Sequence, residues 1–333
     1  MLALISRYIL GLVFLFSGFT KGADPIGFAY SISEYMHAFQ LSSLTDLSII
    51  VAVAVIILEL MTGFALLTGF KPKVSFLVAF LFMFIFTGLT FVLAVTDKIE
   101  DCGCFGSTLV LTNWQTFAKN AVLMLPATYL FMIRNNTTKS NHKVMNGVVF
   151  TLFVLFASWF VAHCYRTQPL LDLPNYSVGA EIEPIIRQTP NNVALIQVVP
   201  NVTKVSPETQ KEFNELFMFC NERGHEFYAY TSSGATERIE YMRNSKMPFP
   251  FEIADEMALK NLMRSKAGLV AVSNGIIIGK WSVNNMPTIE QFTEHGIVAT
   301  ALKEQNHTIQ VMAIIIATLL LIVGLIINRQ AKY

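Results

Sequence analysis

The sequence is poor in charged residues. Lys, Arg, Asp and Glu together make up 14% of its 333 residues, whereas a soluble globular domain usually has about a quarter. This deficit argues against an ordinary soluble cytosolic enzyme. The net charge of +1 also provides no basic surface of the kind that nucleic-acid binding requires. A hydrophobic fraction of 53% favours a membrane protein instead.

The few charged residues are unevenly distributed along the chain. Residues 1–165 contain 16 of them, residues 166–307 contain 29, and residues 308–333 contain only Arg329 and Lys332. The first half and the tail are therefore lipid-soluble in composition. The stretch between them has ordinary polarity and a length that suits one soluble domain.

Six apolar runs of about 17 to 22 residues are long enough to cross a bilayer as helices. They begin near Leu4, Ser48, Val74, Phe117, Val144 and Ile309. The predicted organisation has four parts: a four-helix transmembrane bundle at 1–135, a fifth transmembrane helix at 136–165, an α/β domain at 166–307, and a sixth transmembrane helix with a short tail at 308–333. The predicted fold class is a multi-pass α-helical membrane protein that carries an α/β domain outside the cytoplasm.

The distribution of basic residues predicts the orientation in the membrane, because Lys and Arg near span ends stay on the cytoplasmic face. With both termini in the cytoplasm, that face collects most of the basic residues. In a bacterium this orientation places the protein in the inner membrane, with residues 166–307 in the periplasm. The residues that decide it are Arg7, Lys71, Lys73, Arg134, Lys139, Lys143, Arg329 and Lys332.

The first loop outside the cytoplasm is expected to run from Lys21 to Asp46. Because Lys21 follows the first apolar run at once and no Ala-x-Ala site precedes it, a membrane span is favoured there over a cleaved signal peptide. Asp24-Pro25 and the amphipathic run that follows predict an interfacial helix, which could cover a site like a lid. His37 in this run is read as a surface residue without a catalytic role.

Strand-like and helix-like pieces alternate between Asn192 and Ala301. Strands are predicted at 193–199 and 226–232, helices at 207–223, near 235–245, near 255–265 and from about Thr288, and a hairpin at 268–281 around Asn274-Gly275. This order resembles the thioredoxin fold. The stretch where a thioredoxin has its C-x-x-C reads PNVTKVSP, and Lys266-Ala267-Gly268 stands where a cis-proline would precede the hairpin. The domain is therefore predicted to be a binding or spacer module without redox chemistry.

The chain has four cysteines, Cys102, Cys104, Cys164 and Cys220, which permit three pairings. Cys102 and Cys104 flank a single glycine in the loop after the third span. A disulfide between them would close a small strained ring, and strain makes a disulfide a readier electron acceptor. Two alternatives remain open: half of a metal site, although zinc sites favour wider spacing, or two ordinary reduced thiols. Cys164 is a candidate resolving thiol, and Cys220 is expected to lie in a core.

The membrane half resembles the DoxX/MauE family of inner-membrane proteins, in its MauE-like variety from Bacteroidetes with a C-terminal thioredoxin-like domain that lacks redox cysteines. The resemblance covers about residues 4–133 and rests on SGFTK, the buried Glu59 and DCGCFG. It implies a bundle related in architecture to the vitamin K epoxide reductase and DsbB class, in which periplasmic cysteines exchange disulfides and pass electrons to a quinone. Only Cys102 and Cys104 match cysteines of that class, whose four-thiol relay is absent here.

Two polar residues inside the spans complete the candidate site. Glu59 lies near the middle of the second span, where a charge is costly, so it is expected to face the bundle interior. It would act either as a proton acceptor for thiol or quinone chemistry, or as an interhelical ion-pair partner of Arg7 or Lys119. Lys119 would either stabilise a thiolate of the neighbouring loop or extend to the interface as a solvated side chain.

Together these features predict a thiol-disulfide oxidoreductase or maturation factor. Cys102 and Cys104 would exchange disulfides with periplasmic client proteins, and a quinone is the implied electron acceptor. The alternative is a non-catalytic membrane-anchored scaffold whose α/β domain binds an envelope partner. A small-solute transporter is disfavoured, because the sequence has no convincing internal repeat or broken pair of spans.

Overall fold

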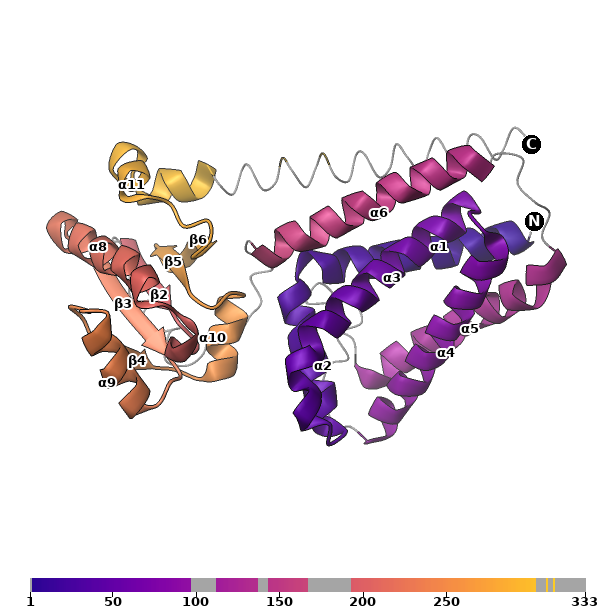
Figure 1. Ribbon diagram of the computed structural model, residues 1–333, viewed down its shortest axis with the longest axis horizontal. Coiled ribbons are helices and arrows are strands. Elements are labelled where there is room, and N and C mark those ends of the chain that lie inside the picture. The colour runs from indigo at the N-terminus through magenta and orange to yellow at the C-terminus, as the bar shows by residue number, and fades with distance from the viewer. Residues whose placement is uncertain are drawn as a thin grey trace. The chain divides into compact units, whose positions relative to one another are not determined.

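The computed structural model describes residues 2–96, 112–136, 143–166, 193–303, 310 and 314. The chain divides into two compact units, residues 1–165 with 317–333, and residues 166–316 (Figure 1). The first unit is helical and the second contains a mixed sheet. The chain is thus a multi-pass membrane protein that also carries a soluble α/β domain.

Five helices of the first unit are long and apolar enough to cross a membrane. They are α1 (Leu2–Ala23), α3 (Ser48–Thr68), α4 (Pro72–Thr96), α5 (Asn113–Ile133) and α6 (Lys143–Arg166). The predicted sixth span and the loop that contains Cys102 and Cys104 lie outside the described residues, apart from residues 310 and 314.

A shorter helix, α2 (Pro25–Ala38), follows α1 where the amphipathic run predicted one. The Asp24 side chain accepts a hydrogen bond from the backbone N–H of Gly27 at 2.8 Å, and Pro25 occupies the first turn, which is where proline suits a helix. A 3₁₀ turn, η1 (Ser42–Leu47), then leads directly into α3.

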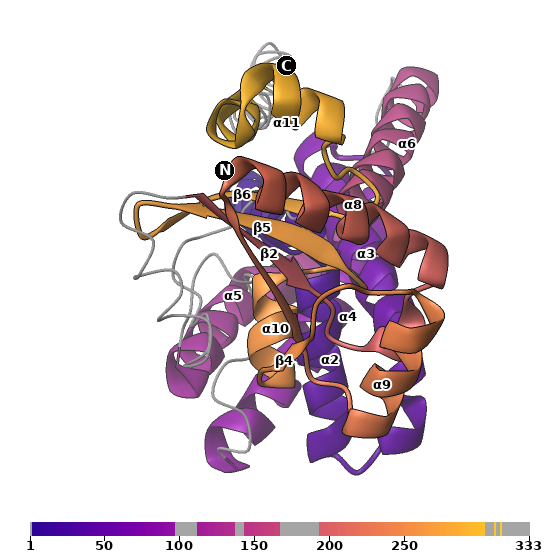
Figure 2. The same cartoon turned by 90° about the vertical axis from the view of Figure 1, so that its left-hand side faces the viewer.

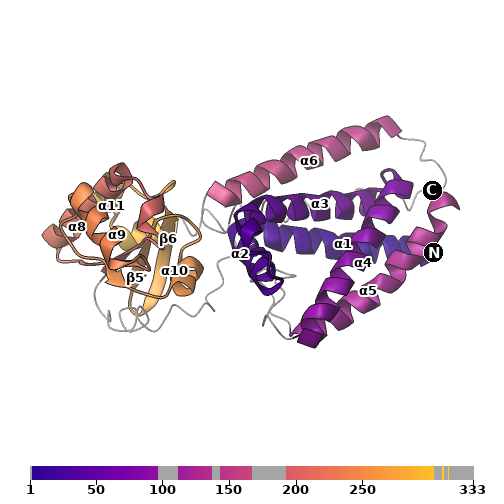
Figure 3. The same cartoon turned by 60° about the horizontal axis from the view of Figure 1, so that its bottom comes forward.

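Helices α1 and α3 pack closely because glycine faces glycine at their crossing. A Cβ atom at Gly63 would lie 2.8 Å from the backbone nitrogen of Leu15 and 2.9 Å from the carbonyl oxygen of Gly11. Such a crossing lets backbones approach without a side chain between them. The two helices run side by side in Figures 1 and 3, as do α4 and α5.

Arg7 binds the end of α3. Its guanidinium donates to the carbonyl oxygens of Leu66 (3.1 Å) and Leu67 (3.4 Å), groups that the last turn of a helix leaves without intrahelical partners. Gly69 ends α3 in the left-handed conformation, with φ +66°. Arg7, one of the two ion-pair partners predicted for Glu59, is therefore engaged at the C-terminal end of α3 and not with Glu59 in the middle of that helix.

Helix α6 packs on the same bundle through stacked aromatic rings. Phe153 stacks on Phe64 of α3 with centroids 4.0 Å apart, and Phe160 stacks on Phe19 of α1 at 5.1 Å. Phe153 and Phe160 are both buried. Aromatic pairs of this kind stabilise packing beyond the area they bury.

The α/β domain is built on a five-stranded sheet in the order β4-β3-β2-β5-β6. Strands β2, β3 and β4 are parallel, and β5 and β6 are antiparallel to their neighbours. Helices α8 and α11 pack on one face and α10 on the other, as Figure 2 shows. The elements are β2 (Val193–Val198), η3 (Val202–Lys204), α8 (Pro207–Arg223), β3 (Glu226–Thr231), α9 (Ala235–Asn244), β4 (Glu252–Ile253), α10 (Glu256–Leu262), β5 (Gly268–Ser273), β6 (Ile276–Ser282) and α11 (Ile289–His295).

The local signals in this domain lie where the sequence predicted them. Ser206 caps α8 and Gly224 ends it with φ +71°. Asn274 and Gly275 both have positive φ in the β5–β6 turn, as a type I′ turn requires. Cys220 is fully buried in the core between α8 and the sheet, which confirms its predicted place.

We predict that Gly63→Ala destabilises the membrane bundle by about 1–3 kcal/mol, the usual cost of overpacking, because the new methyl group would meet backbone atoms of α1. The midpoint of thermal unfolding of the purified protein in detergent measures this change.

Gly88→Ala is the matched control, since a Cβ at that position in α4 would meet no atom within 4 Å. Equal midpoints for the two variants would contradict the close crossing of α1 and α3.

Candidate functional site within the membrane bundle

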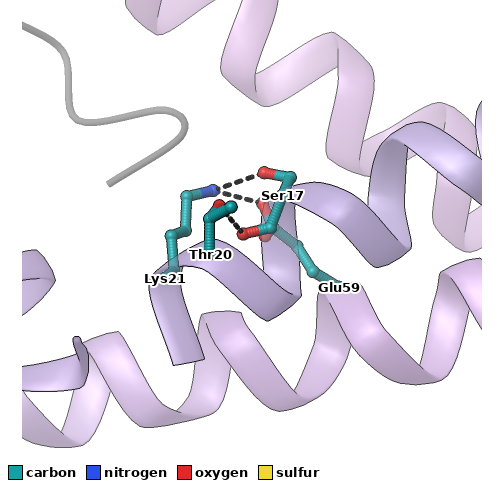
Figure 4. A network of polar contacts seen from close by, with 4 residues as sticks. All are labelled: Ser17, Thr20, Lys21 and Glu59. Carbon is teal, nitrogen blue, oxygen red and sulfur yellow. Dashed lines mark hydrogen bonds and ion pairs between the residues drawn. The ribbon is translucent and has the colours of Figure 1, made fainter. Parts of the chain in front are cut away.

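A buried ion pair joins the first and third helices. The Nζ of Lys21 lies 2.6 Å from Oε1 of Glu59 (Figure 4), and the two residues are 1% and 3% exposed. Burying either charge alone would cost several kcal/mol, and only close pairing with further hydrogen bonds offsets that cost. The prediction that Glu59 faces the bundle interior is confirmed.

Side chains from four helices surround the Lys21 ammonium group. It donates to Oγ of Ser17 on its own helix at 3.0 Å and to Glu59 of α3. It also lies 5.0 Å from the ring centroid of Phe28 on α2 and 5.5 Å from that of Phe86 on α4, distances at which a cation is attracted to an aromatic face. One cation thus connects α1, α2, α3 and α4.

The backbone at this point differs from the prediction. Lys21 was expected to open the first outer loop, but α1 continues through it to Ala23. The physical reason is the ion pair: a lysine that has a buried carboxylate as its partner does not have to leave the helix for water. Thr20 supports the same turn, since its hydroxyl donates to the carbonyl oxygen of Ser17 at 3.0 Å (Figure 4).

The two carboxylate oxygens of Glu59 differ in their hydrogen bonding. Oε2 is buried and accepts no hydrogen bond from any residue that the structure describes. A buried carboxylate oxygen without a donor is costly, so this atom is free to accept a hydrogen bond from a water molecule in the cavity.

Glu59 lines a cavity of about 40 Å³ between the α1/α3 pair and the α4/α5 pair. This volume is enough for at least one water molecule. Its polar lining comes from three helices and contains two cations and one carboxylate, while α4 contributes apolar side chains. The polar residues are Ser17, Lys21, Glu59, Lys119 and Asn120, and the residues from α4 are Phe82, Met83 and Phe86.

Helix α5 brings Lys119 and Asn120 to this cavity. The Asn120 amide donates to Oγ1 of Thr90 on α4 at 3.2 Å, and both residues are buried. The start of α5 is fixed by a capping box, in which Thr112 and Gln115 exchange hydrogen bonds, an arrangement that satisfies two backbone donors. The sequence named Glu59 and Lys119 as separate candidates, and the structure brings them to one cavity.

The structure partly changes the predicted roles of the site residues. The ion-pair partner found within hydrogen-bond distance of Glu59 is Lys21, which the sequence reading had assigned to a loop. Lys119 remains a cavity-lining cation. Cys102 and Cys104 lie outside the described residues, and Cys164 and Cys220 are both buried free thiols.

Ser17, Lys21 and Asn120 are site residues that sequence reasoning missed. A signal was present for two of them, because Ser17 and Lys21 are four residues apart and so share a helix face. For Asn120 the only signal was its place beside Lys119. A polar residue at the end of an apolar run is usually read as the end of the span, which explains why Lys21 was not recognised.

The described residues contain no group of three or more His, Cys, Asp or Glu side chains that could hold a metal ion. The cavity has a volume of about 40 Å³, well below the roughly 150 Å³ of an engineered cavity that binds benzene, so it does not enclose a quinone ring.

The fold and the site define a helical membrane bundle with a charged interior. Residues 1–133 match the family model described as methylamine utilisation protein MauE. The match covers α1 to α5 and includes Lys21, Glu59 and Lys119, and it supports a MauE/DoxX-like membrane family for this part of the chain. No curated protein and no solved structure matches the chain.

We predict that Lys21→Met and Glu59→Leu each destabilise the bundle by about 3–5 kcal/mol, because each leaves one buried charge without its partner. The double variant should recover most of this loss, since it removes both charges. Thermal unfolding midpoints in detergent measure the three changes.

Lys73→Met, at an exposed position, serves as the control for loss of a lysine. A double variant that is as unstable as the sum of the single variants would show that the two side chains do not form a pair.

We predict that Cys220 resists alkylation in the folded protein. Burial raises the pKa of its thiol to about 12, so at pH 8 the thiol stays protonated, and the reactive species is the thiolate. Labelling with N-ethylmaleimide should be slower than for an exposed cysteine by about three orders of magnitude. Peptide mass mapping measures the rate.

Met218→Cys provides the comparison, because Met218 lies on the same helix and is 50% exposed. Equal labelling at positions 218 and 220 in the folded protein would contradict the buried position of Cys220.

Proposed function

We propose that this chain is a membrane thiol-disulfide exchange factor that acts on client proteins through Cys102 and Cys104. The observation that carries the proposal is the charged cavity close to the start of α5, the helix that follows the C-G-C loop. Lys119 is six residues after Asn113, a distance of about 9 Å along a helix. A carboxylate and two ammonium groups, one of them that of Lys119, line one cavity and are suited to thiol chemistry.

The proposed reaction balances without any further cofactor. A client thiolate attacks one sulfur of a Cys102–Cys104 disulfide and forms a mixed disulfide, and the second client thiolate then displaces the loop sulfur. The client is oxidised by two electrons, the loop pair is reduced to two thiols, and the two protons of the client thiols pass to the loop sulfurs. The strained ring expected for a C-G-C disulfide favours this direction.

The charged residues of the cavity have separate roles in this proposal. Lys119 stabilises a thiolate of the loop, as cations near a cysteine do. Glu59 accepts a proton, for which its Oε2 atom has no competing donor among the described residues. Lys21 keeps Glu59 in place through the 2.6 Å contact. The implied quinone, if it regenerates the disulfide, would act from outside this cavity.

The proposed orientation has the N-terminus in the cytoplasm of a bacterium and the C-G-C loop in the periplasm. Basic residues at the described span ends support it, because in this orientation Arg7, Lys71, Lys73 and Arg134 would all lie on the cytoplasmic side, where such residues collect. Because α5 and α6 cross the membrane in succession, the α/β domain after α6 would lie on the same side of the membrane as the loop.

We propose a thioredoxin-like fold without redox activity for the α/β domain, and a role in holding the client. Parallel strands β2 and β3 joined by α8, and an antiparallel hairpin of β5 and β6, support the fold. Cys220, the cysteine of this domain, is buried with its pKa raised to about 12. A domain whose cysteine is buried in this way would bind the client without exchanging thiols with it.

The proposal predicts that Cys102 and Cys104 are oxidised in growing cells and that Cys104→Ser traps a mixed disulfide with the client. Acid quenching of membranes, mass-tag alkylation and peptide mapping measure the oxidation state of each cysteine. Cys220 and Cys164, both buried, serve as internal references for reduced thiols. A trapped adduct should disappear on treatment with reductant.

The matched control is Cys164→Ser, which removes a thiol of the membrane part but leaves the C-G-C pair intact. Fully reduced Cys102 and Cys104 in growing cells, together with a Cys102→Ser/Cys104→Ser variant that behaves as the wild type, would disprove the redox function.

One observation favours a second candidate, a non-catalytic scaffold: the cysteine of the α/β domain is buried, and burial raises the pKa of its thiol to about 12. A scaffold would copurify with an envelope partner in fixed proportion and independently of reductant. An exchange factor would release its partner when the mixed disulfide is reduced.

A further inference from the structure

The buried hydroxyls of Thr87 and Thr116, near the cavity, lack within the described part of the chain the hydrogen bonds that other threonines of the same helices make. Thr90 and Thr128 donate to the carbonyl oxygen four residues earlier, each at 2.8 Å. The Oγ1 atoms of Thr87 on α4 and Thr116 on α5 are buried and have no hydrogen-bond partner among the described residues. Buried hydroxyls that are left unpaired by the protein are usually satisfied by ordered water.

Thr116 shares a face of α5 with the cavity. It lies four residues before Asn120 and three before Lys119, both of which line the cavity, and residues at these spacings are neighbours on a helix surface. Asn113, three residues before Thr116, is buried on the same face at the first turn of α5. Asn113, Thr116 and Asn120 therefore form a polar row that leads from the cavity to the start of the helix.

Thr87 occupies the corresponding place on α4. It lies four residues after Met83, which lines the cavity, and three before Thr90, which accepts the hydrogen bond from Asn120. The unpaired polar atoms Glu59 Oε2, Thr87 Oγ1 and Thr116 Oγ1 thus all belong to the cavity or to positions one helical turn from it. The cavity volume of about 40 Å³ is sufficient for water.

We propose that the cavity holds ordered water that connects Glu59 to the Thr116 hydroxyl and forms a proton path toward the first turn of α5. The cavity would bind water, and the path would carry protons. The path ends at the first turn of α5, the helix that follows the C-G-C motif in the sequence. The charged groups facing Glu59 in the described part of the chain are Lys21 of α1 and Lys119 of α5, while α4 contributes only apolar side chains to the lining.

The use of this path rests on the proposed disulfide exchange. When a client dithiol reduces the loop disulfide, two protons leave the client sulfurs and two arrive at the loop sulfurs. Glu59 would hold one of these protons during the transfer, and the water would carry it between the carboxylate and the loop. The path itself is a property of the bundle and can be tested without a client.

The test is a pH-jump experiment on the full-length protein in detergent, followed by infrared spectroscopy. Acidification produces a carboxylic acid band from Glu59, which Glu59→Gln identifies by its loss. Thr116→Val should slow the appearance of this band by at least about tenfold, equivalent to about 1.4 kcal/mol in the barrier. Thr116→Ser, which retains the hydroxyl, should keep the wild-type rate.

Thr128→Val is the matched control, because Thr128 lies on the same helix and its hydroxyl is already bonded to the carbonyl oxygen of Met124. Thr87→Val is also expected to slow the appearance of the carboxylic acid band, and it replaces Thr116→Val if that variant does not fold. Two results would overturn the proton path. The first is a wild-type rate in folded Thr116→Val, or in folded Thr87→Val if Thr116→Val does not fold. The second is slowing by Thr128→Val that equals the slowing by Thr116→Val.

The proton path and the proposed function fail in distinguishable ways. If the band is slowed by Thr116→Val but Cys102 and Cys104 are reduced and dispensable in cells, the path stands and the exchange function is lost. If the cysteines exchange disulfides and the band rate is unchanged in Thr116→Val, the exchange function stands and the path is disproved.

Discussion

The bundle depends on one buried cation. Lys21 is 1% exposed, and its ammonium group is held by a hydroxyl from α1, a carboxylate from α3 and aromatic rings from α2 and α4. Removing α1 or α3 would leave the other helix with an unpaired charge in an apolar interior, at a cost of several kcal/mol, whereas α2 and α4 each contribute an aromatic ring to the cation. The ion pair therefore does more than link two helices. Four helices, α1 to α4, meet at this cation, and both members of the ion pair line the cavity to which α5 contributes Lys119 and Asn120.

This constraint also explains why the candidate site is compact. Glu59 uses one carboxylate oxygen for the ion pair, and its other oxygen accepts no hydrogen bond from the described residues. The cavity that Glu59 lines receives Lys119 and Asn120 from a helix that begins only six residues before Lys119. A buried ionisable pair, a second cation and hydroxyls without a partner among the described residues thus occur in or within one helical turn of one cavity, close to the first turn of α5, the helix that follows the C-G-C motif in the sequence.

Much of the fold was predictable because local signals determine it. Ser206-Pro207 and Gly224 set the bounds of α8, and Asn274-Gly275 set the turn between β5 and β6. The two-residue strand β4 was missed, since it has no periodicity of its own and exists only because β3 offers it an edge. Glu59 was found because a carboxylate in an apolar run is costly. Its partner Lys21 was not, because the two are 38 residues apart in sequence and only tertiary packing brings them together.

The aromatic contacts of α6 have a consequence for how the protein is made. Phe19 and Phe64 stack on Phe160 and Phe153, so α1 and α3 present rings whose partners are synthesised about 90–140 residues later at the ribosome. The family match ends at residue 133, before α6 begins at Lys143. The stacked contacts with α6 can therefore form only after the first five helices have been synthesised, so the packing of the described bundle is completed last by α6.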